Sequence, residues 1–468
     1  MRTKITGGTV VSPGGRFAAD IVAEDGVIVE LAQPGRAGAA DAELDAGGRL
    51  VFPGFIDPHV HSRDPGMTEK EDFAHSTLAA LCGGVTTICE MPNAVPPVSD
   101  VHTFHDRAAQ HSEVASVDFG LWGLSLGPEN LDQIRGLLEA GVVGVKLFWG
   151  YALNSVTKQL VYNLADEPPE NLILPPANGE VYDLFREVAA AGGLLAAHCE
   201  DRGIMEAAQR ALGRDLQEYE DLLTVRPDAA EAAAIAVAVE MSRATGCRFH
   251  VVHISSARGV DIVRRAQSQG TTITAETCPH YLTLTDQDYP EIGPKMKIYP
   301  PVRRAADRDA IWDALRDGTI TSVGSDHAPH TVAQKSQDLA SQPAGAVGVE
   351  TLAPLMLNEM VAGRISPERL AWVCSEGTAR LYGLHPRKGS LLPGSDCDLT
   401  IVDPEGEWQI DNASLHSKHN LSPYHGRRGR GRVLMTVLRG ELAMRDGEPE
   451  GDPRGRPLRS ARAEAARA

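Results

Sequence analysis

The sequence predicts an α/β fold in which a (β/α)₈ TIM barrel is joined to a small β-sandwich built from both ends of the chain. Between residues 54 and 326, eight short β-rich runs alternate with longer stretches of helical character, as expected when crossover helices connect parallel strands. Residues 1–52 and about 390–450 are also β-rich, with Gly, Pro and Asp-Gly turn signals, but lack long helical patterns. These two terminal segments can pair into one sandwich.

The eight expected barrel strands are spaced along the middle of the chain. They are residues 54–61, 84–91, 117–124, 142–148, 193–199, 248–254, 271–276 and 320–326. Helix candidates lie between them, including residues 228–245, where Gly246 follows as a typical C-cap. Residues 154–179, after the fourth strand, form a long insertion with several prolines, for which we expect a functional lid or a mobile loop.

Four segments follow from this pattern. Residues 1–52 form the N-terminal part of the sandwich, residues 53–385 the barrel, and residues 386–450 the C-terminal part of the sandwich. Residues 451–468 are a polar tail rich in Ala and Arg, expected to be a loose surface helix or a frayed end.

Composition excludes several classes of function. The chain has 468 residues, 42% of them hydrophobic, and a formal net charge of -18, which argues against a surface that binds nucleic acid. No long apolar run predicts a membrane span, and the first residues lack the apolar core of a signal peptide, so we expect a cytoplasmic protein. The seven cysteines are scattered and never form a Cys-x-x-Cys pair, which indicates reduced, mostly buried thiols; a catalytic cysteine is the alternative.

Chemistry-bearing side chains stand at the ends of the expected strands, where barrel enzymes place their active sites. His59 and His61 share one face of the first strand, because side chains two residues apart point the same way. The other strands contribute Lys146, His198, His253 and Asp326. Imidazole and carboxylate suit zinc and similar metals, so the pattern predicts a metal centre. For a histidine outside this set, such as His75, His102, His105 or His111, a structural role is the simpler interpretation.

Lys146 is unexpected among metal ligands, because an ammonium group should avoid cations. One interpretation is a lysine that extends from a strand end toward solvent. The other interpretation is a site with two metal ions, which need an anion to bridge them. The fourth strand offers no Asp or Glu for this purpose. A lysine carboxylated by CO₂ would supply that anion.

Several motifs together resemble the cyclic amidohydrolases of the amidohydrolase superfamily, which include dihydroorotase, allantoinase and hydantoinase (dihydropyrimidinase). They are "DPHVH", "GVKLF", "AAHCED", "FHVVHISSARGV", "TAETCPHYLTL", "GSDHAPH" and "GSLLPGSDCDLTIVD". The resemblance extends from about residue 3 to 450 and implies a metal-binding barrel with a sandwich assembled from both termini.

The resemblance also implies roles for single residues. His59, His61 and Asp326 would hold one divalent metal ion, expected to be zinc, and His198 and His253 the other, with Lys146 bridging them as N6-carboxylysine. Asp326 would act as general base and then as general acid in the hydrolysis of a cyclic amide, or in its reversal. The family further suggests a homodimer or homotetramer. His280 and Asp57 are expected to support the site or to be structural.

The substrate is predicted from fewer residues. As in dihydroorotases, Arg63, Asn93 and His330 would face a substrate carboxylate, which matches the fork of a guanidinium group. A surface ion pair with Asp64 or Glu71 is the alternative for Arg63. Allantoinases typically have Asn at this position.

Two residues depart from the dihydroorotase pattern. Tyr151 lies five residues after Lys146, a spacing that resembles hydantoinases, where the tyrosine helps stabilise the oxyanion. Tyr299 occupies a place where many dihydroorotases have Asn and hydantoinases have Ser. "DFGLWGL" and "SLHSKHNLSPYHGRRGRGRV" also look hydantoinase-like. A dihydroorotase-like activity is the leading expectation, followed by hydantoinase and then allantoinase. A non-catalytic scaffold related to dihydropyrimidinases is a different class, but every expected ligand position is occupied.

Overall fold

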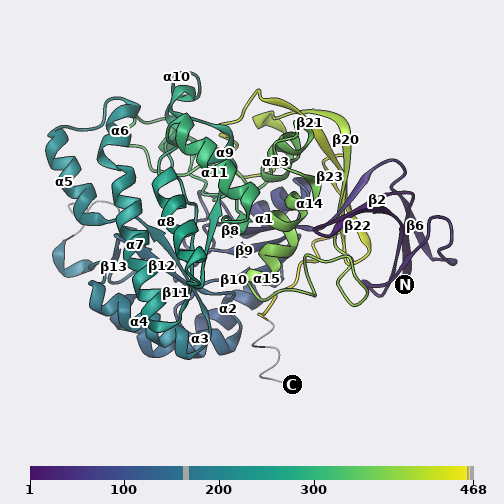
Figure 1. Ribbon diagram of the computed structural model, residues 1–468, viewed down its shortest axis with the longest axis horizontal. Coiled ribbons are helices and arrows are strands. Elements are labelled where there is room, and N and C mark those ends of the chain that lie inside the picture. Colours follow the sequence, from purple (N-terminus) through teal and green to yellow (C-terminus); the bar gives the residue numbers. More distant parts are fainter. Residues whose placement is uncertain (162–167, 461–462, 464–468) are drawn as a thin grey trace.

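The computed structural model describes residues 1–161, 168–460 and 463. Figure 1 shows a barrel surrounded by helices and, beside it, a layered β domain that carries the N-terminus. None of the helices in these residues is long and apolar enough to cross a membrane. All seven cysteines are buried and free.

The barrel strands pair in parallel and in chain order. They are β8 (Phe55–Val60), β9 (Val85–Glu90), β10 (Asp118–Leu121), β11 (Gly123–Leu124), β12 (Val145–Trp149), β16 (Leu194–Cys199), β17 (Arg248–Val251), β18 (Ile273–Thr277) and β19 (Ser322–Val323). The third expected run is divided at Trp122 into β10, which pairs with β9, and β11, which pairs with β12. A bridge between Val60 and His327 joins the first strand to the residues after the eighth. The predicted barrel fold is confirmed.

Helices cover the outside of the barrel (Figure 1). The longer ones are α1 (Phe73–Cys82), α2 (Val101–Ser112), α3 (Ile134–Ala140), α4 (Asn178–Ala190), α5 (Arg202–Leu212), α6 (Tyr219–Val225), α7 (Asp228–Thr245), α8 (Ala257–Ser268), α11 (Ala305–Asp317) and α13 (Leu352–Val361). Short helices are α9 (Pro279–Thr283), α10 (Tyr289–Ile292), α12 (Val332–Lys335), α14 (Pro367–Ala371) and α15 (Gly377–Leu381). Their ends follow local rules. The Asp72 side chain caps α1, and Gly246, in the left-handed conformation, ends α7 as predicted.

The sandwich has two sheets with strands from both ends of the chain. One contains β1 (Arg2–Thr6), β4 (Asp20–Glu24), β5 (Val27–Ala32) and β6 (Ala42–Asp45). The other contains β2 (Thr9–Ser12), β3 (Gly15–Ala18), β7 (Leu50–Pro53), β20 (Leu399–Gln409), β21 (Arg428–Leu438), β22 (Glu441–Arg445) and β23 (Glu448–Pro449). Ile5, Ile21, Val51, Leu399 and Val437 share its buried core, so the termini fold together.

Residues 455–458 depart from the expectation of a loose helix or a frayed end. The Phe119 N–H donates to the Arg456 carbonyl at 3.0 Å, and the Leu458 N–H donates to the Phe119 carbonyl at 2.7 Å. Because the third barrel run divides at Trp122, β10 has a strand neighbour on one side only, and its free backbone groups need partners. The extended tail supplies them, and Leu458 is buried.

The insertion after the fourth strand contains a small antiparallel sheet within its described part. Its strands are β13 (Ala152–Asn154), β14 (Leu160–Val161) and β15 (Leu172–Ile173). Leu160 lines the cavity at the barrel mouth. Residues 162–167 of the expected lid or loop lie outside the described residues.

Candidate active site

His59, His61 and Asp326 meet at the carboxyl ends of the first and eighth strands. The Nε2 atoms of His59 and His61 each lie 3.3 Å from Asp326 Oδ1. A tetrahedral ion with bonds of about 2.0–2.1 Å keeps its ligand atoms about 3.3 Å apart. The spacing therefore fits three ligand atoms around one divalent ion.

His198 and His253 form a second pair, at the ends of β16 and β17. His198 Nδ1 lies 3.1 Å from His253 Nε2, again close to the spacing of two atoms on one ion. This pair lies beside the group of three, since the rings of His59 and His253 have centroids 5.3 Å apart.

Lys146 lies on β12 and lines the same cavity as these groups. Its side chain is fully buried, and Nζ has no hydrogen-bond partner among the described residues. Burial lowers the pKa of Lys146 to about 8, although Asp326 and Glu276 act in the opposite direction. An amine without a partner at this position is costly unless it is modified or bound.

Acceptors behind the histidines fix which ring nitrogen faces the cavity. His59 Nδ1 lies 2.8 Å from Glu276 Oε1, and His61 Nδ1 lies 2.7 Å from Asn93 Oδ1. His198 Nε2 lies 2.7 Å from Glu200 Oε2. Each acceptor takes a hydrogen bond from one ring N–H, so the other ring nitrogen presents its lone pair to a metal ion.

The electrostatics favour neutral imidazoles beside an ionised carboxylate. Burial lowers the pKa of His61 to about 4 and holds the pKa of His253 well below its usual value. Burial would raise the pKa of Asp326, but His59 and His61 outweigh this effect and keep it far below the usual range. Metal ions bind these protonation states.

Three residues of the site also have strained backbones. Arg63, His253 and Asp326 have φ angles of 60°, 39° and 48°, which side chains other than glycine rarely adopt. Such strain is typical of functional sites, where the surrounding structure holds it in place.

Arg63 is 5% exposed, so it is not a surface residue. Its Nε donates to the Pro329 carbonyl at 3.3 Å, and Nη2 lies 3.5 Å from His330 Nε2. His330 Nε2 also lies 2.9 Å from the Ala344 carbonyl. The structure thus brings His330 to Arg63, while Arg63 and Asn93 line the cavity itself.

Tyr151 and Tyr299 lie on the side of His198. The Tyr151 hydroxyl accepts a hydrogen bond from Arg226 Nη2 at 2.8 Å, and the Arg226 guanidinium stacks 3.4 Å from the centroid of the Tyr299 ring. Arg226 also pairs with Glu200, the acceptor behind His198. Arg226 therefore connects both tyrosines to a candidate metal ligand.

Asp57 and His280 take supporting positions. Asp57 Oδ1 accepts the backbone N–H groups of His59 at 3.1 Å and Ser325 at 2.9 Å, which ties the first strand to the eighth. Burial raises the pKa of Asp57 to about 7. His280 is buried and lines a small cavity together with Ser325 and Asp326.

One cavity of about 50 Å³ unites the site. All six predicted metal ligands line it, together with Arg63, Asn93, Tyr151 and Tyr299. A larger cavity of about 830 Å³ adjoins it and shares Tyr151, Tyr299 and Ala344. Such an arrangement can hold a small molecule between two metal positions and a buried cation.

Sequence reasoning missed Glu200, Glu276 and Arg226. Glu200 lies two residues after His198, and Glu276 ends the seventh expected strand, so strand alternation could have indicated both. Arg226 stands in a loop before α7, where no local pattern points to the site.

Candidate metal ligands at the mouth of a barrel indicate the class of metal-dependent barrel enzymes, and comparisons with known proteins narrow this class. The Amidohydrolase family matches residues 50–443. Allantoinase from Rubrobacter xylanophilus is 38% identical over 462 residues, covering 98% of this chain and 97% of the relative. Dihydroorotase from Geobacter sp. is 34% identical over 454 residues, covering 96% of this chain and 100% of the relative. The solved structure of L-hydantoinase (dihydropyrimidinase) from Arthrobacter aurescens has a TM-score of 0.90 and 33% identity, covering 98% and 99% of the two chains.

The chain belongs to the amidohydrolase family, within its group of cyclic amidohydrolases. Membership implies the use of divalent metal ions, and the residues around Lys146 can hold them. It also implies hydrolysis of a cyclic amide, as the resemblance of the sequence motifs suggests.

Proposed function

We propose that this protein hydrolyses the ring C–N bond of a cyclic ureide at a centre of two divalent metal ions, expected to be zinc. The observation that carries the proposal is that three candidate metal ligands, a further pair of histidines and the buried Lys146 line one cavity. His59, His61 and Asp326 would hold one ion, and His198 and His253 the other. The two ions, when bound, would polarise the scissile carbonyl and lower the pKa of a water molecule to about 7.

Lys146 would supply the bridging anion. Its amine nitrogen attacks CO₂, a C–N bond forms, and the proton that the nitrogen loses leaves to solvent, so a neutral amine becomes a carbamate anion. Burial favours this change, because the pKa of Lys146 near 8 leaves part of the amine neutral at physiological pH. The carbamate would carry two oxygens where the amine has no hydrogen-bond partner among the described residues.

Asp326 would move the proton. Its carboxylate lines the cavity beside His59 and His61, so the oxygen that does not hold the ion can accept a proton from the attacking water. The same carboxyl group then gives that proton to the ring nitrogen as the C–N bond breaks. Glu276 and Asn93 keep both histidines oriented during this exchange.

For the substrate, we favour a ring that carries a carboxylate, of the dihydroorotate type. The support is the buried guanidinium of Arg63, which lines the cavity together with Asn93. A guanidinium and an amide can together donate several hydrogen bonds to one carboxylate.

A neutral ring, such as a hydantoin or allantoin, is the second candidate. The Tyr151 hydroxyl lines the same cavity and is oriented by Arg226, which suits a donor to the oxygen that becomes negative during attack. The names of the allantoinase and L-hydantoinase relatives favour this candidate as well.

Turnover of dihydroorotate, hydantoin, dihydrouracil and allantoin on one preparation tests the choice. The first candidate predicts the highest kcat/KM for dihydroorotate. A preparation that turns over only the three neutral rings would favour the second candidate, and no turnover of any ring would contradict the proposed reaction.

Arg63→Met separates recognition from structure. We expect kcat/KM for the carboxylated ring to fall about tenfold to a hundredfold, the usual loss for a hydrogen-bonded charged contact, while neutral rings change little. Lys70→Met is the matched control, because Lys70 is a cation on the same loop but does not line the cavity. Equal loss for all four substrates in Arg63→Met would indicate a structural role for Arg63 instead.

A further inference from the structure

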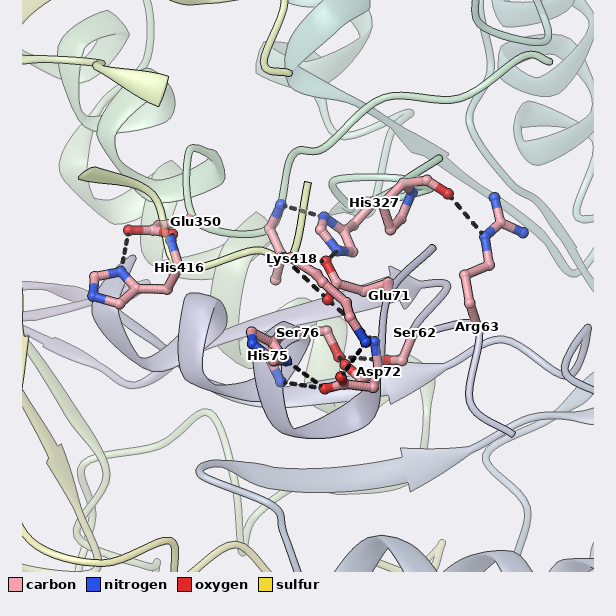
Figure 2. A network of polar contacts seen from close by, with 12 residues as sticks. Ser62, Arg63, Glu71, Asp72, His75, Ser76, His327, Glu350, His416 and Lys418 are labelled. Atoms are coloured by element: carbon pink, nitrogen blue, oxygen red, sulfur yellow. Dashed lines mark hydrogen bonds and ion pairs between the residues drawn. The ribbon is translucent and has the colours of Figure 1, made fainter. Parts of the chain in front are cut away.

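The connection between β20 and β21 leaves the sandwich and crosses the barrel face that carries the site. We call residues 415–420 of this connection the strap. Figure 2 shows His416 and Lys418 of the strap reaching Glu350 on one side and Glu71 and Asp72 on the other. The strap therefore contacts two barrel loops that lie far apart in the sequence.

The first contact is with the loop after β8, which begins with His61 and Arg63. Both carboxylate oxygens of Glu71 accept the backbone N–H of Lys418, each at 3.2 Å. Lys418 Nζ donates to the Thr68 carbonyl at 2.6 Å and to Asp72 Oδ2 at 3.0 Å. This loop is thus held by backbone and side chain of one strap residue (Figure 2).

The second contact is with the segment that packs on the loop after β19. His416 donates its backbone N–H to Glu350 Oε2 at 2.7 Å, and its Nδ1 lies 2.9 Å from Glu350 Oε1. The two residues before Glu350 contact the loop after β19 directly. The backbone N–H groups of Gly348 and Val349 donate to His327 Nδ1 at 3.1 and 3.4 Å.

The two contacts converge on His327, the residue after Asp326. His327 Nδ1 accepts from the backbone, and Nε2, which makes no hydrogen bond to the described residues, lies 3.6 Å from Glu71 Oε2. Both side chains are fully buried. The His327 carbonyl accepts the His61 N–H at 2.8 Å, so this residue is linked to both candidate ligands, His61 and Asp326.

We propose that Glu71 and His327 are positioning residues, and that the strap holds them so that His61 and Asp326 stay at ligand distance. The inference rests on the proposed function for its effect on activity. It assigns a role to the "SLHSKHNLSPY" segment, which contains none of the candidate metal ligands. The segment's Tyr424 supports this role, since it lines the small cavity that Asp326 also lines.

The test compares Glu71→Ala and Glu71→Gln with Glu359→Ala. Glu359 is a matched control because it is also a buried carboxylate beside the same connection, pairing with Arg364 at 3.2 Å and Arg427 at 3.8 Å, but it does not touch His327. Three quantities are measured on the full chain: amide hydrogen exchange of residues 61–72 and 326–350, the rate of zinc loss to a chelator, and kcat with KM.

We expect Glu71→Ala to speed exchange in both loops, to raise the rate of zinc loss about tenfold, and to lower kcat about tenfold with a smaller change in KM. Glu71→Gln keeps one acceptor oxygen and should be intermediate in all three. Glu359→Ala should lower the melting temperature without changing zinc loss or kcat.

The inference is overturned if Glu71→Ala keeps wild-type exchange in both loops. It is also overturned if zinc loss and kcat change in Glu71→Ala and Glu359→Ala alike, in proportion to the fall in each variant's melting temperature. A failure of the proposed function gives a different result, in which exchange in the two loops rises as expected although wild-type protein turns over no cyclic amide.

Discussion

Lys146 is the residue on which the proposed chemistry depends most directly. A fully buried lysine with no hydrogen-bond partner for Nζ, among the residues that the structure covers, would be costly in an ordinary core. Phe148 offers only its ring, with the centroid 5.1 Å from Nζ. Carboxylation would convert this cation into an anion that suits the surrounding imidazoles.

Lys146→Ala should therefore lose at least about a hundredfold in kcat, because the bridging anion is missing. A short carboxylic acid such as propionate fits the space that the side chain leaves and should restore part of the activity. His198→Ala is the control, since it lacks an imidazole ligand and keeps Lys146, so added imidazole should restore its activity better than propionate does. Wild-type kcat in Lys146→Ala, without any added acid, would refute the bridge.

At the same scale, sequence predicted the candidate ligands better than their partners. His59 and His61 could be placed because strand alternation is a local rule, and strand ends collect at one face of a barrel. Arg226 could not, because its contacts with Glu200 and Tyr151 form only after distant loops pack. His330 was expected to face the substrate, and it lies beside Arg63, outside the residues that line the cavity.

At the scale of elements, two buried lysines hold the segment 338–345, whose last residues line the cavity. Lys297 Nζ donates to the Leu339 and Gln342 carbonyls, both at 2.7 Å. Lys335 Nζ donates to the Lys297 and Pro343 carbonyls at 3.3 and 3.2 Å. Carbonyl oxygens satisfy these ammonium groups, but no carboxylate among the described residues pairs with Lys335 in an ion pair.

This packing predicts a pH dependence of stability. Burial, and then Lys297, lower the pKa of Lys335 from 10.5 to about 7. Between about pH 7 and 10 the unfolded chain binds a proton that the folded chain lacks, so this residue's contribution to the free energy of unfolding rises with pH, by at most about 1.4 kcal/mol per pH unit. Below pH 7 the cost of burying the charge is fully present.

Lys335→Met removes that titration. The melting temperature of the wild type minus that of Lys335→Met should therefore increase between pH 6.5 and 8.5. A difference that stays constant over this range would contradict the lowered pKa.

Element positions were predictable where a pattern repeats locally. All eight barrel runs could be recognised, because β-rich segments and helical stretches alternate. The division of the third run at Trp122 could not, since it depends on a side chain whose Nε1 donates to the Pro58 carbonyl at 3.1 Å across the barrel. The pairing of residues 455–458 with β10 follows from that division. The polar composition of the tail does not predict this pairing.

At the scale of the whole molecule, a cluster of buried charges joins the C-terminal part of the sandwich to barrel strand β10. Lys388 Nζ lies 2.5 Å from Asp118 on β10 and 2.6 Å from Asp398, just before β20, with Asp396 at 2.8 Å. Arg439, after β21, pairs with Asp118 too. Burial lowers the pKa of Lys388 less than these carboxylates raise it, so the ammonium stays charged. The union of both termini was visible in the sequence, but this long-range cluster was not.

Two divalent ions at the barrel mouth carry the proposed reaction. The most direct measurement is the metal content of the purified protein, combined with activity before chelation, after chelation and after zinc is restored. We expect about two equivalents of divalent metal per chain, loss of activity on chelation, and its recovery with zinc. A metal-free protein whose hydrolysis of a cyclic amide is unchanged by chelator would contradict the account.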